Sequence, residues 1–345
     1  PMRPDLRPKL RNPTATALRD RNCIQLDLDP AHSLLLTGDV SQIRDFLAAL
    51  TGEQTVAQLC EQFEFAAAAL FQLGQRGLLE AELLDSSITA ALPAAQLDRL
   101  LINQRSHQSA AANLDFAVER INNLANSYVW IDTAGPASAL AALLLAEQHV
   151  GRIKLAQAAA FKALDLPSWL KPVPDAETAL LTSMQSVSAN LKLTQPAGMP
   201  NPDLIIIADQ PWLDPSETAS FLNRGIPHLV IDPLISEVAI GPMVLPGDSG
   251  CLSCQEQKLR NVDRSWPIMR QLIGQHLRDQ PDRLLLLTAV SFAIAQIIEA
   301  IGRGSFAQSA LVGNRWRFKL PGPTIEIMRC DPNMFCSCQW GAIAA

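Results

Sequence analysis

The chain is short of charged and aromatic side chains. Only 18 % of its 345 residues are Asp, Glu, Lys or Arg, and tyrosine occurs once. The formal net charge of −6 excludes a nucleic-acid binder that works by bulk electrostatic attraction, because such proteins carry an excess of Lys and Arg. The hydrophobic fraction of 48 % is high enough for a large buried core, and the length suits two domains.

The sequence also lacks the marks of export and of a membrane span. Its first residues contain no apolar segment of the kind that a signal peptide carries. The longest uncharged apolar run, 284–298, is shorter than the roughly 20 residues that a membrane span needs, and it contains Gln296. We therefore predict a cytoplasmic protein without membrane contact, in which this run forms a buried core helix.

No nucleophilic triad and no metallohydrolase spacing is found, so no catalytic residue is predicted. The five histidines are scattered along the sequence. His228, at the entry of a predicted strand, either lines a cleft or, as is more common, satisfies a loop carbonyl.

Residues 1–85 have the pattern of a small separate domain. Residues 23–29 alternate apolar and polar side chains, as a half-buried strand does, and residues 33–36 can pair with them. Three helices and a short strand are expected next, at 39–52, from Thr55, at 65–77 and at 78–82. This order is typical of a winged helix-turn-helix.

Many winged helices read DNA with their third helix, but the basic side chains of this third helix are limited to Arg76. Phosphate contacts need several Lys and Arg side chains, so DNA binding is disfavoured. Capture of a peptide as an added strand suits the alternating strand at 23–29 better.

A helical linker is predicted over 86–127, with helices at 95–101 and 110–124. From Tyr128 the pattern changes to strands and helices in alternation, which predicts an α/β domain over 128–345 with a doubly wound parallel sheet. The expected strands are 128–132, 152–156, 204–208 and 228–232, and the expected helices are 137–150 and 215–224.

The first strand-to-helix turn of this domain is a degenerate nucleotide site. Segment 132–138 has a single glycine, Gly135, followed by a proline that removes an N–H donor. Gln157 stands where a ribose-binding acid is expected. Asp209 ends a parallel strand at the edge where open sheets bind ligands, although it can equally cap a helix.

Four of the seven cysteines form two short pairs, Cys251 with Cys254 and Cys336 with Cys338. This spacing predicts a structural zinc held by four thiolates, with an iron–sulfur cluster or two unrelated thiol pairs as the alternatives. Among the other cysteines, Cys23 and Cys60 are expected to be buried, and Cys330 can be a spare thiol near the metal.

Several segments occur together in one order: 202–209, 224–228, the proline-glycine turn 241–247, the CxxC at 251–254, 263–267 and the CxC at 336–338. In these the chain resembles the ThiF-like proteins of azole-modified peptide biosynthesis, described as cyclodehydratase C-domain or leader peptide-binding proteins. The resemblance covers roughly residues 125–340.

The resemblance implies a fold of the ubiquitin-activating-enzyme type with a structural zinc. It also implies an N-terminal recognition element that clamps a precursor's leader as an added strand. The matching side chains here are Ile24, Leu26 and Leu28 on the strand and Phe65, Leu70 and Leu73 on the third helix, all of which could instead belong to the core.

Family members that adenylate their substrate carry a glycine-rich loop, a ribose-binding acid and an arginine that acts on the phosphates. This chain lacks that set, so the resemblance points to a non-adenylating adaptor that presents a peptide to a YcaO-type cyclodehydratase. An ATP-dependent adenylating enzyme and a regulatory or interaction protein are the alternatives. A homodimer is possible.

Overall fold

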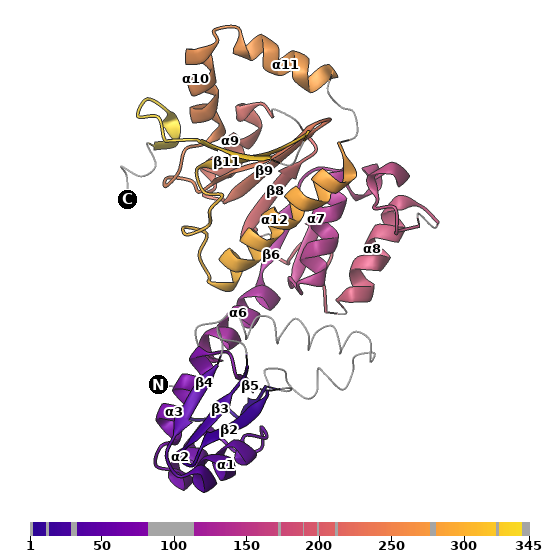
Figure 1. The fold of residues 1–345 in the computed structure, drawn as a ribbon. Helices are drawn as coiled ribbons and strands as arrows, with labels where there is room; N and C mark the ends of the chain where they lie inside the picture. Colours follow the sequence, from indigo (N-terminus) through magenta and orange to yellow (C-terminus); the bar gives the residue numbers. More distant parts are fainter. Residues whose placement is uncertain are drawn as a thin grey trace. The chain divides into compact units, whose positions relative to one another are not determined.

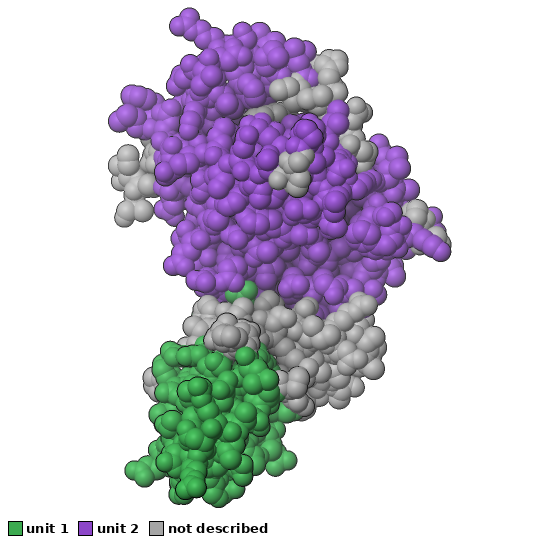
Figure 2. Space-filling view, viewed as in Figure 1, with its two compact units in different colours: residues 1–122 green, residues 123–345 purple. Residues whose placement is uncertain are grey.

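The structure is a computed structural model that describes residues 3–11, 14–28, 33–81, 114–171, 174–188, 190–198, 200–210, 213–276, 281–321 and 324–339. The chain forms two compact units, residues 1–122 and 123–345, which are coloured separately in Figure 2. The predicted linker lies outside the described residues up to 113, and so does the helix expected at 95–101. From there helix α6 (Leu114–Asn126) is described, and the division between the units falls within it.

In the described part of the first unit, two small sheets and three helices precede α6 (Figure 1). Strand β1 (Pro8–Leu10) pairs with β5 (Leu79–Ala81), and β2 (Thr16–Asp20), β3 (Cys23–Leu26) and β4 (Leu34–Thr37) form an antiparallel sheet in that order. The helices are α1 (Val40–Ala49), α2 (Val56–Gln62) and α3 (Ala66–Gln75).

Capping residues begin two of these helices where the sequence predicts. Asp39 accepts hydrogen bonds from the N–H groups of Ser41 and Gln42, and Thr55 forms a reciprocal capping box with Gln58. The apolar faces of the helices then pack around Phe46, which is fully buried. Strands β1 and β2 were not predicted, because β2 is exposed along its whole length and has no apolar alternation to reveal it.

The second unit is built on a seven-stranded sheet of order β12-β11-β10-β9-β8-β6-β7. Its strands are β6 (Tyr128–Ile131), β7 (Arg152–Leu155), β8 (Leu204–Ala208), β9 (His228–Leu234), β10 (Glu237–Val244), β11 (Asn314–Lys319) and β12 (Thr324–Arg329). The larger helices are α7 (Pro136–Glu147), α8 (Ala176–Val187), α10 (Leu252–Val262), α11 (Trp266–His276) and α12 (Arg283–Gly302). The described part of this unit also contains the 3₁₀ turns η1 (Ala158–Ala160), η2 (Ala163–Asp165), η3 (Pro215–Thr218) and η4 (Ser337–Gln339).

The expectation of a parallel sheet is half wrong. Strands β7, β6, β8 and β9 are parallel, but β9, β10, β11 and β12 pair antiparallel, so the sheet is mixed. The antiparallel half was missed because short turns, rather than helices, connect β9 to β10 and β11 to β12. The helix expected at 215–224 is a 3₁₀ turn, η3 (Pro215–Thr218), followed by the short helix α9 (Ala219–Asn223).

The apolar run at 284–298 forms α12, the one described helix that is long and apolar enough to cross a membrane by length and composition. Its side chains pack against α7, β10 and β11, and most of its buried residues belong to the core of the second unit. Figure 1 shows α12 and α7 together on one face of the sheet. This is the packing of the buried core helix that the sequence predicts.

Candidate functional sites

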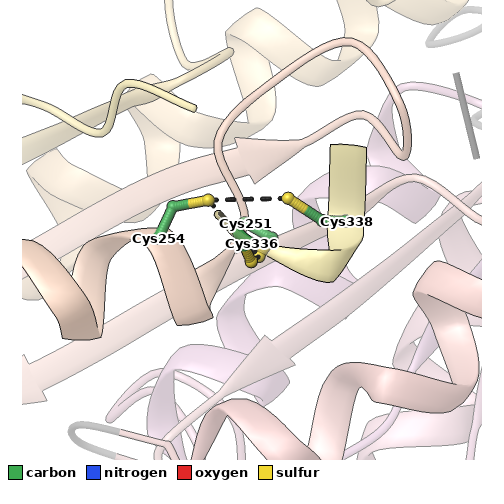
Figure 3. Close-up of side chains that lie close together, drawn as sticks. All are labelled: Cys251, Cys254, Cys336 and Cys338. Atoms are coloured by element: carbon green, nitrogen blue, oxygen red, sulfur yellow. Dashed lines mark hydrogen bonds between the residues drawn. The ribbon is translucent and has the colours of Figure 1, made fainter. Parts of the chain in front are cut away.

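The two cysteine pairs meet in space (Figure 3). The Sγ atom of Cys251 lies 3.8 Å from that of Cys254 and 3.6 Å from that of Cys336, and Cys254 lies 3.5 Å from Cys338. All four Sγ atoms lie within 4.8 Å of one another. These separations are far beyond the about 2.05 Å of a disulfide bond, and none of the four cysteines forms one.

A tight turn delivers the first pair. In segment 245–250 the buried hydroxyl of Ser249 accepts a hydrogen bond from the N–H of Leu245, and Gly247 has a φ of +88°. A Cβ atom at Gly250 would lie 2.1 Å from the carbonyl oxygen of Cys330. Only glycine therefore lets this turn lie against the segment that leads to the second pair.

Helix α10 then holds its own two thiols in place. Cys251 is the residue that precedes the helix, and Cys254 lies in its first turn. The unpaired N–H groups of a helix N-terminus favour negative charge, so they favour thiolates at these positions.

Asn333 supports the cluster from the C-terminal knuckle, which is the segment 331–338 that carries Cys336 and Cys338. Its N–H donates to the Sγ atom of Cys254 at 3.3 Å, and its carbonyl accepts from the N–H of Cys336 at 2.8 Å. Its side-chain amide also donates to Gln257 on α10. The sequence analysis missed Asn333, since an asparagine three residues before a cysteine carries no distinctive signal.

The thiols share their protons unequally. The S–H of Cys251 donates to Cys254, and this bond is the main cause that lowers the pKa of Cys254 to about 5. The pKa of Cys251 is raised, first by the same bond and then by burial, and burial raises the pKa of Cys336 to about 11. A cation in the centre of the cluster would lower the pKa of every one of these thiols.

The spacing of the thiols suits one tetrahedral ion. Four thiolates about 2.3 Å from a central Zn²⁺ lie about 3.8 Å from one another, close to the three distances above. In an iron–sulfur cluster the four thiolates are divided over two or four irons, so thiolates on different irons are held farther apart. The cluster is therefore compatible with zinc, which is the metal that the sequence predicts.

The other cysteines divide differently from the prediction. Cys23 and Cys330 are buried, as expected of the first, and Cys330 lies in the strand-to-knuckle segment that packs on Gly250. Burial raises the pKa of the Cys330 thiol to about 11. Cys60 was expected to be buried and is exposed, because it lies on the outer face of the amphipathic helix α2.

At the predicted degenerate nucleotide site, a carboxylate of the chain itself binds the first turn of α7. One carboxylate oxygen of Asp209 accepts a hydrogen bond from the N–H of Ala137 at 3.0 Å. The other accepts from the N–H and the hydroxyl of Ser138, at 2.9 and 2.7 Å. Asp209 thus caps the N-terminus of α7, which was the second of the two roles considered for it.

Gly135 makes this contact possible. A Cβ atom at residue 135 would lie 2.4 Å from the Cγ atom of Asp209, so the carboxylate rests directly on the glycine. Asp209 itself has a φ of +60°, a conformation that few non-glycine residues adopt. Burial raises the pKa of the Asp209 carboxyl, and its three hydrogen bonds oppose that rise.

This position is where the fold binds phosphate. In a Rossmann-type unit the phosphates of a nucleotide lie at the N-terminus of the helix after the first strand, which here is α7. The Asp209 carboxylate holds the N–H groups there. Gln157, at the end of β7, donates its amide to the carbonyl of Asp132 instead of facing a ribose.

The predicted peptide-binding side chains are distributed between core and surface. Ile24, Leu26, Leu70 and Leu73 are buried in the core of the first unit, and Phe65 is half-buried beside it. Leu28 is 69 % exposed, and it lies beyond the end of β3, which stops at Leu26.

Strand β3 itself has no open edge, because β2 and β4 pair with its two sides. A peptide cannot add to it. In the described part of the chain no strand pairs with the outer edge of β4, which packs against α3 and is the third strand of its sheet.

The hydrogen-bond pattern shows which groups this edge presents. The N–H of Gly38 donates to the carbonyl of Asn22 on the β3 side. Main-chain groups alternate in direction along a strand, so those of Leu36 face β3 and those of Leu35 and Thr37 face outward. The side chain of Leu35 is 45 % exposed, whereas those of its strand neighbours Leu34 and Leu36 are buried.

His228 does not line a cleft. It is fully buried, its Nδ1 atom lies 3.0 Å from the carbonyl oxygen of Ile226, and its ring packs on Phe221. The more common of the two predicted roles is therefore the correct one. Burial lowers the pKa of this imidazole to about 4.

Comparisons with solved structures bear on the fold. The chain is similar to E. coli MccB with succinimide (TM-score 0.63, 15 % identity) and to the microcin C7 biosynthetic enzyme MccB with N-formylated MccA (TM-score 0.61, 14 % identity), covering 96 % of this chain and 99 % of each MccB chain. It is also similar to a heterocyclase in complex with substrate and cofactor (TM-score 0.58, 16 % identity), covering 97 % of this chain and 39 % of the heterocyclase.

No protein-family model matches the sequence, and no curated protein matches it. At identities near 15 % the structural likeness shows the fold alone. It confirms the ThiF-like fold that the resemblance implied for this chain.

Proposed function

We propose that this chain is a non-adenylating adaptor that binds the leader of a precursor peptide and presents it to a separate YcaO-type cyclodehydratase for azoline formation. In this proposal residues 1–85 are a winged-helix recognition element, 86–127 a helical linker and 128–345 a ThiF-like domain. The protein acts in the cytoplasm, and no residue of this chain is assigned a catalytic role.

The observation that carries the proposal is the Asp209 carboxylate at the N-terminus of α7. A nucleotide phosphate would need the N–H groups of Ala137 and Ser138, and Asp209 already satisfies them. Two negative groups cannot share one helix N-terminus without strong repulsion. The N–H groups of this loop therefore have an acceptor without a nucleotide, which suits a protein that acts as a scaffold.

Peptide binding is assigned to the outer edge of β4. This edge presents outward-facing main-chain groups at Leu35 and Thr37, and α3 lies along it. An extended leader added there gains main-chain hydrogen bonds and places alternate side chains toward the helix. The edge replaces the strand at 23–29 as the expected contact.

The cysteine cluster is assigned to a structural zinc. Cys251, Cys254, Cys336 and Cys338 would use all four tetrahedral positions, which leaves none open for catalysis. When bound, the ion supplies folding free energy by joining the start of α10 to the C-terminal knuckle.

The need for a partner is supported by the heterocyclase comparison. This chain matches only 39 % of that heterocyclase, which was solved in complex with a substrate and a cofactor. Most of the heterocyclase chain has no counterpart in this protein. We propose that a separate YcaO-type protein takes the place of that missing part and carries out the ATP-using step.

One observation favours adenylation as a second candidate. The fold also matches E. coli MccB with ATP over 96 % of this chain, at a TM-score of 0.61. An adenylating protein of this fold would require Asp209 to leave the α7 N–H groups when ATP binds.

Reconstitution separates the two candidates. The purified chain is mixed with a YcaO-type protein and a precursor peptide from the same organism, with Mg²⁺ and ATP, and the mass of the peptide is measured by mass spectrometry. We expect loss of one water per azoline only when both proteins are present. Conversion by the YcaO-type protein alone, or adenylation of the peptide by this chain alone, would refute the proposal.

A further inference from the structure

A cavity of about 260 Å³ opens on the second unit beside the first turn of α7. Leu140 on α7, Leu166 and Trp169 in the segment after η1, and Leu286 and Leu287 on α12 contribute to its wall. Most of its lining is apolar, and its size lies just below the range of about 300–1,000 Å³ that is usual for sites of drug-sized ligands. It suits one large side chain better than a nucleotide.

The mouth of the cavity displays apolar side chains on a fixed backbone. Leu164 is 70 % exposed and Trp169 is 68 % exposed. Their segment is anchored because buried Asp165 accepts the N–H of Lys162, and the Arg283 guanidinium donates to the carbonyl of Leu164. Exposed apolar side chains around an apolar hollow indicate a contact surface.

Two exposed cationic side chains lie at or beside the mouth of the cavity. Arg283 lines the cavity and is exposed, and Lys162, which precedes the lining residue Ala163, is exposed as well. Two acids lie nearby, and both are engaged: Asp165 lines the cavity but is buried and accepts the N–H of Lys162, and the exposed Asp282 caps α12 by accepting the N–H of Leu285. Charge complementarity therefore favours an apolar side chain with a carboxylate beside it.

We propose that this cavity binds an aromatic or branched aliphatic side chain of the precursor peptide next to an acidic residue, in a part of the peptide outside the leader strand. The inference rests on the proposed function, because that function supplies the peptide. The ThiF-like domain then recognises substrate through its own pocket, and its recognition does not depend on a nucleotide.

The probe is the tripeptide acetyl-Asp-Phe-Asp-amide with a 4-fluoro label on the ring, and its binding to the full chain is followed by ¹⁹F NMR. We expect Trp169→Ala to weaken binding at least tenfold. The matched control is Leu284→Ala, since Leu284 is 71 % exposed on the same helix as Arg283 and lies outside the lining. It should bind as the unaltered chain does.

A second probe with Ser in place of both Asp residues tests the charges. We expect it to bind at least fivefold more weakly than the acidic probe, and Arg283→Gln should remove most of that difference. Equal binding of the two probes to the unaltered chain, or equal binding of the acidic probe to the chain and to Trp169→Ala, would overturn the inference.

Leader binding is measured on the same samples and separates this inference from the proposed function. If leader binding persists while the acidic probe fails, only the cavity assignment is wrong. If the probe fails and Trp169→Ala instead breaks the complex with the cyclodehydratase, the cavity receives a protein segment and the inference is likewise overturned.

Discussion

The carboxylate of Asp209 accepts three hydrogen bonds from the first turn of α7. Such a half-buried cap differs from an exposed one, because removing it leaves the N–H groups of the buried residues Ala137 and Ser138 in a place that water reaches poorly. Asp175, which caps α8 from an exposed position, accepts its N–H bond from Thr178 and provides the comparison.

We expect Asp209→Ala to lower the free energy of unfolding by about 1–3 kcal/mol, because the N–H groups of Ala137 and Ser138 lose their acceptor. Asp175→Ala should cost about 1 kcal/mol or less. Urea unfolding followed by circular dichroism measures both. A change below about 0.5 kcal/mol for Asp209→Ala, the level of an ordinary surface substitution, would contradict the proposed cap.

The Cys254 thiol accepts from Asn333 and contacts two other thiols of the cluster. We expect Cys254→Ser to release the bound zinc and to lower stability by several kcal/mol, because binding energy at a structural site is folding energy. Metal analysis and thermal unfolding measure the two effects. Cys60→Ser, at the exposed cysteine, is the control and should change neither. A full complement of zinc in Cys254→Ser would contradict the ligand set.

His228 gives the stability a pH dependence. Its pKa of about 4 in the folded chain lies below the value of about 6.5 in an unfolded one, so only the unfolded chain gains a proton between these values. The contribution of His228 to the free energy of unfolding is therefore fully present above about pH 6.5. It is lost as the pH drops toward 4, and the loss amounts to about 3 kcal/mol. We expect His228→Leu to reduce that slope, measured by urea unfolding at several pH values. A slope identical to that of the unaltered chain would show that the imidazole is charged when folded.

At the scale of elements, the two outer edges of the β2-β3-β4 sheet differ. The edge of β4 lies beside α3 and carries the half-exposed Leu35, whereas β2 is exposed along its whole length. The N–H of Asp27 donates to the carbonyl of Ala15, so by alternation the main-chain groups of Leu18 face outward on β2.

The outward-facing main-chain groups of Leu35 on β4 and Leu18 on β2 allow a matched pair of variants. Leu35→Pro removes an outward N–H from β4, and Leu18→Pro removes one from β2. We expect the first to weaken binding of a fluorescent leader peptide at least tenfold, measured by anisotropy, and the second to leave it unchanged. Equal losses, or a loss only in Leu18→Pro, would place the leader elsewhere.

The sequence predicts the elements whose signals are local. Asp39 and Thr55 fix the starts of two helices, and the uncharged run of β8 identifies a buried parallel strand. The antiparallel strands β10 to β12 were missed because short turns rather than helices connect β9 to β10 and β11 to β12, and because β10 pairs with β11 from far away in the sequence. Spacing found the four clustered thiols, but it could not show that Asp209 reaches across 72 residues to Ala137.

At the scale of the whole molecule, the Asp209 cap of α7 and the cysteine cluster lie in the same unit and have different roles. The cap fills a nucleotide position with a carboxylate of the chain, and the cluster joins α10 to the C-terminal knuckle. Both features suit the scaffold role that we propose for the second unit, in which a separate partner carries out the chemistry.

Peptide-dependent ATP–pyrophosphate exchange by the purified chain tests this account most directly. The chain, with its zinc bound and with leader binding verified, is incubated with precursor peptide, Mg²⁺, ATP and labelled pyrophosphate. A non-adenylating adaptor produces no labelled ATP above the level without enzyme. Labelled ATP that appears only with the peptide, at a rate that rises with chain concentration, would contradict that role.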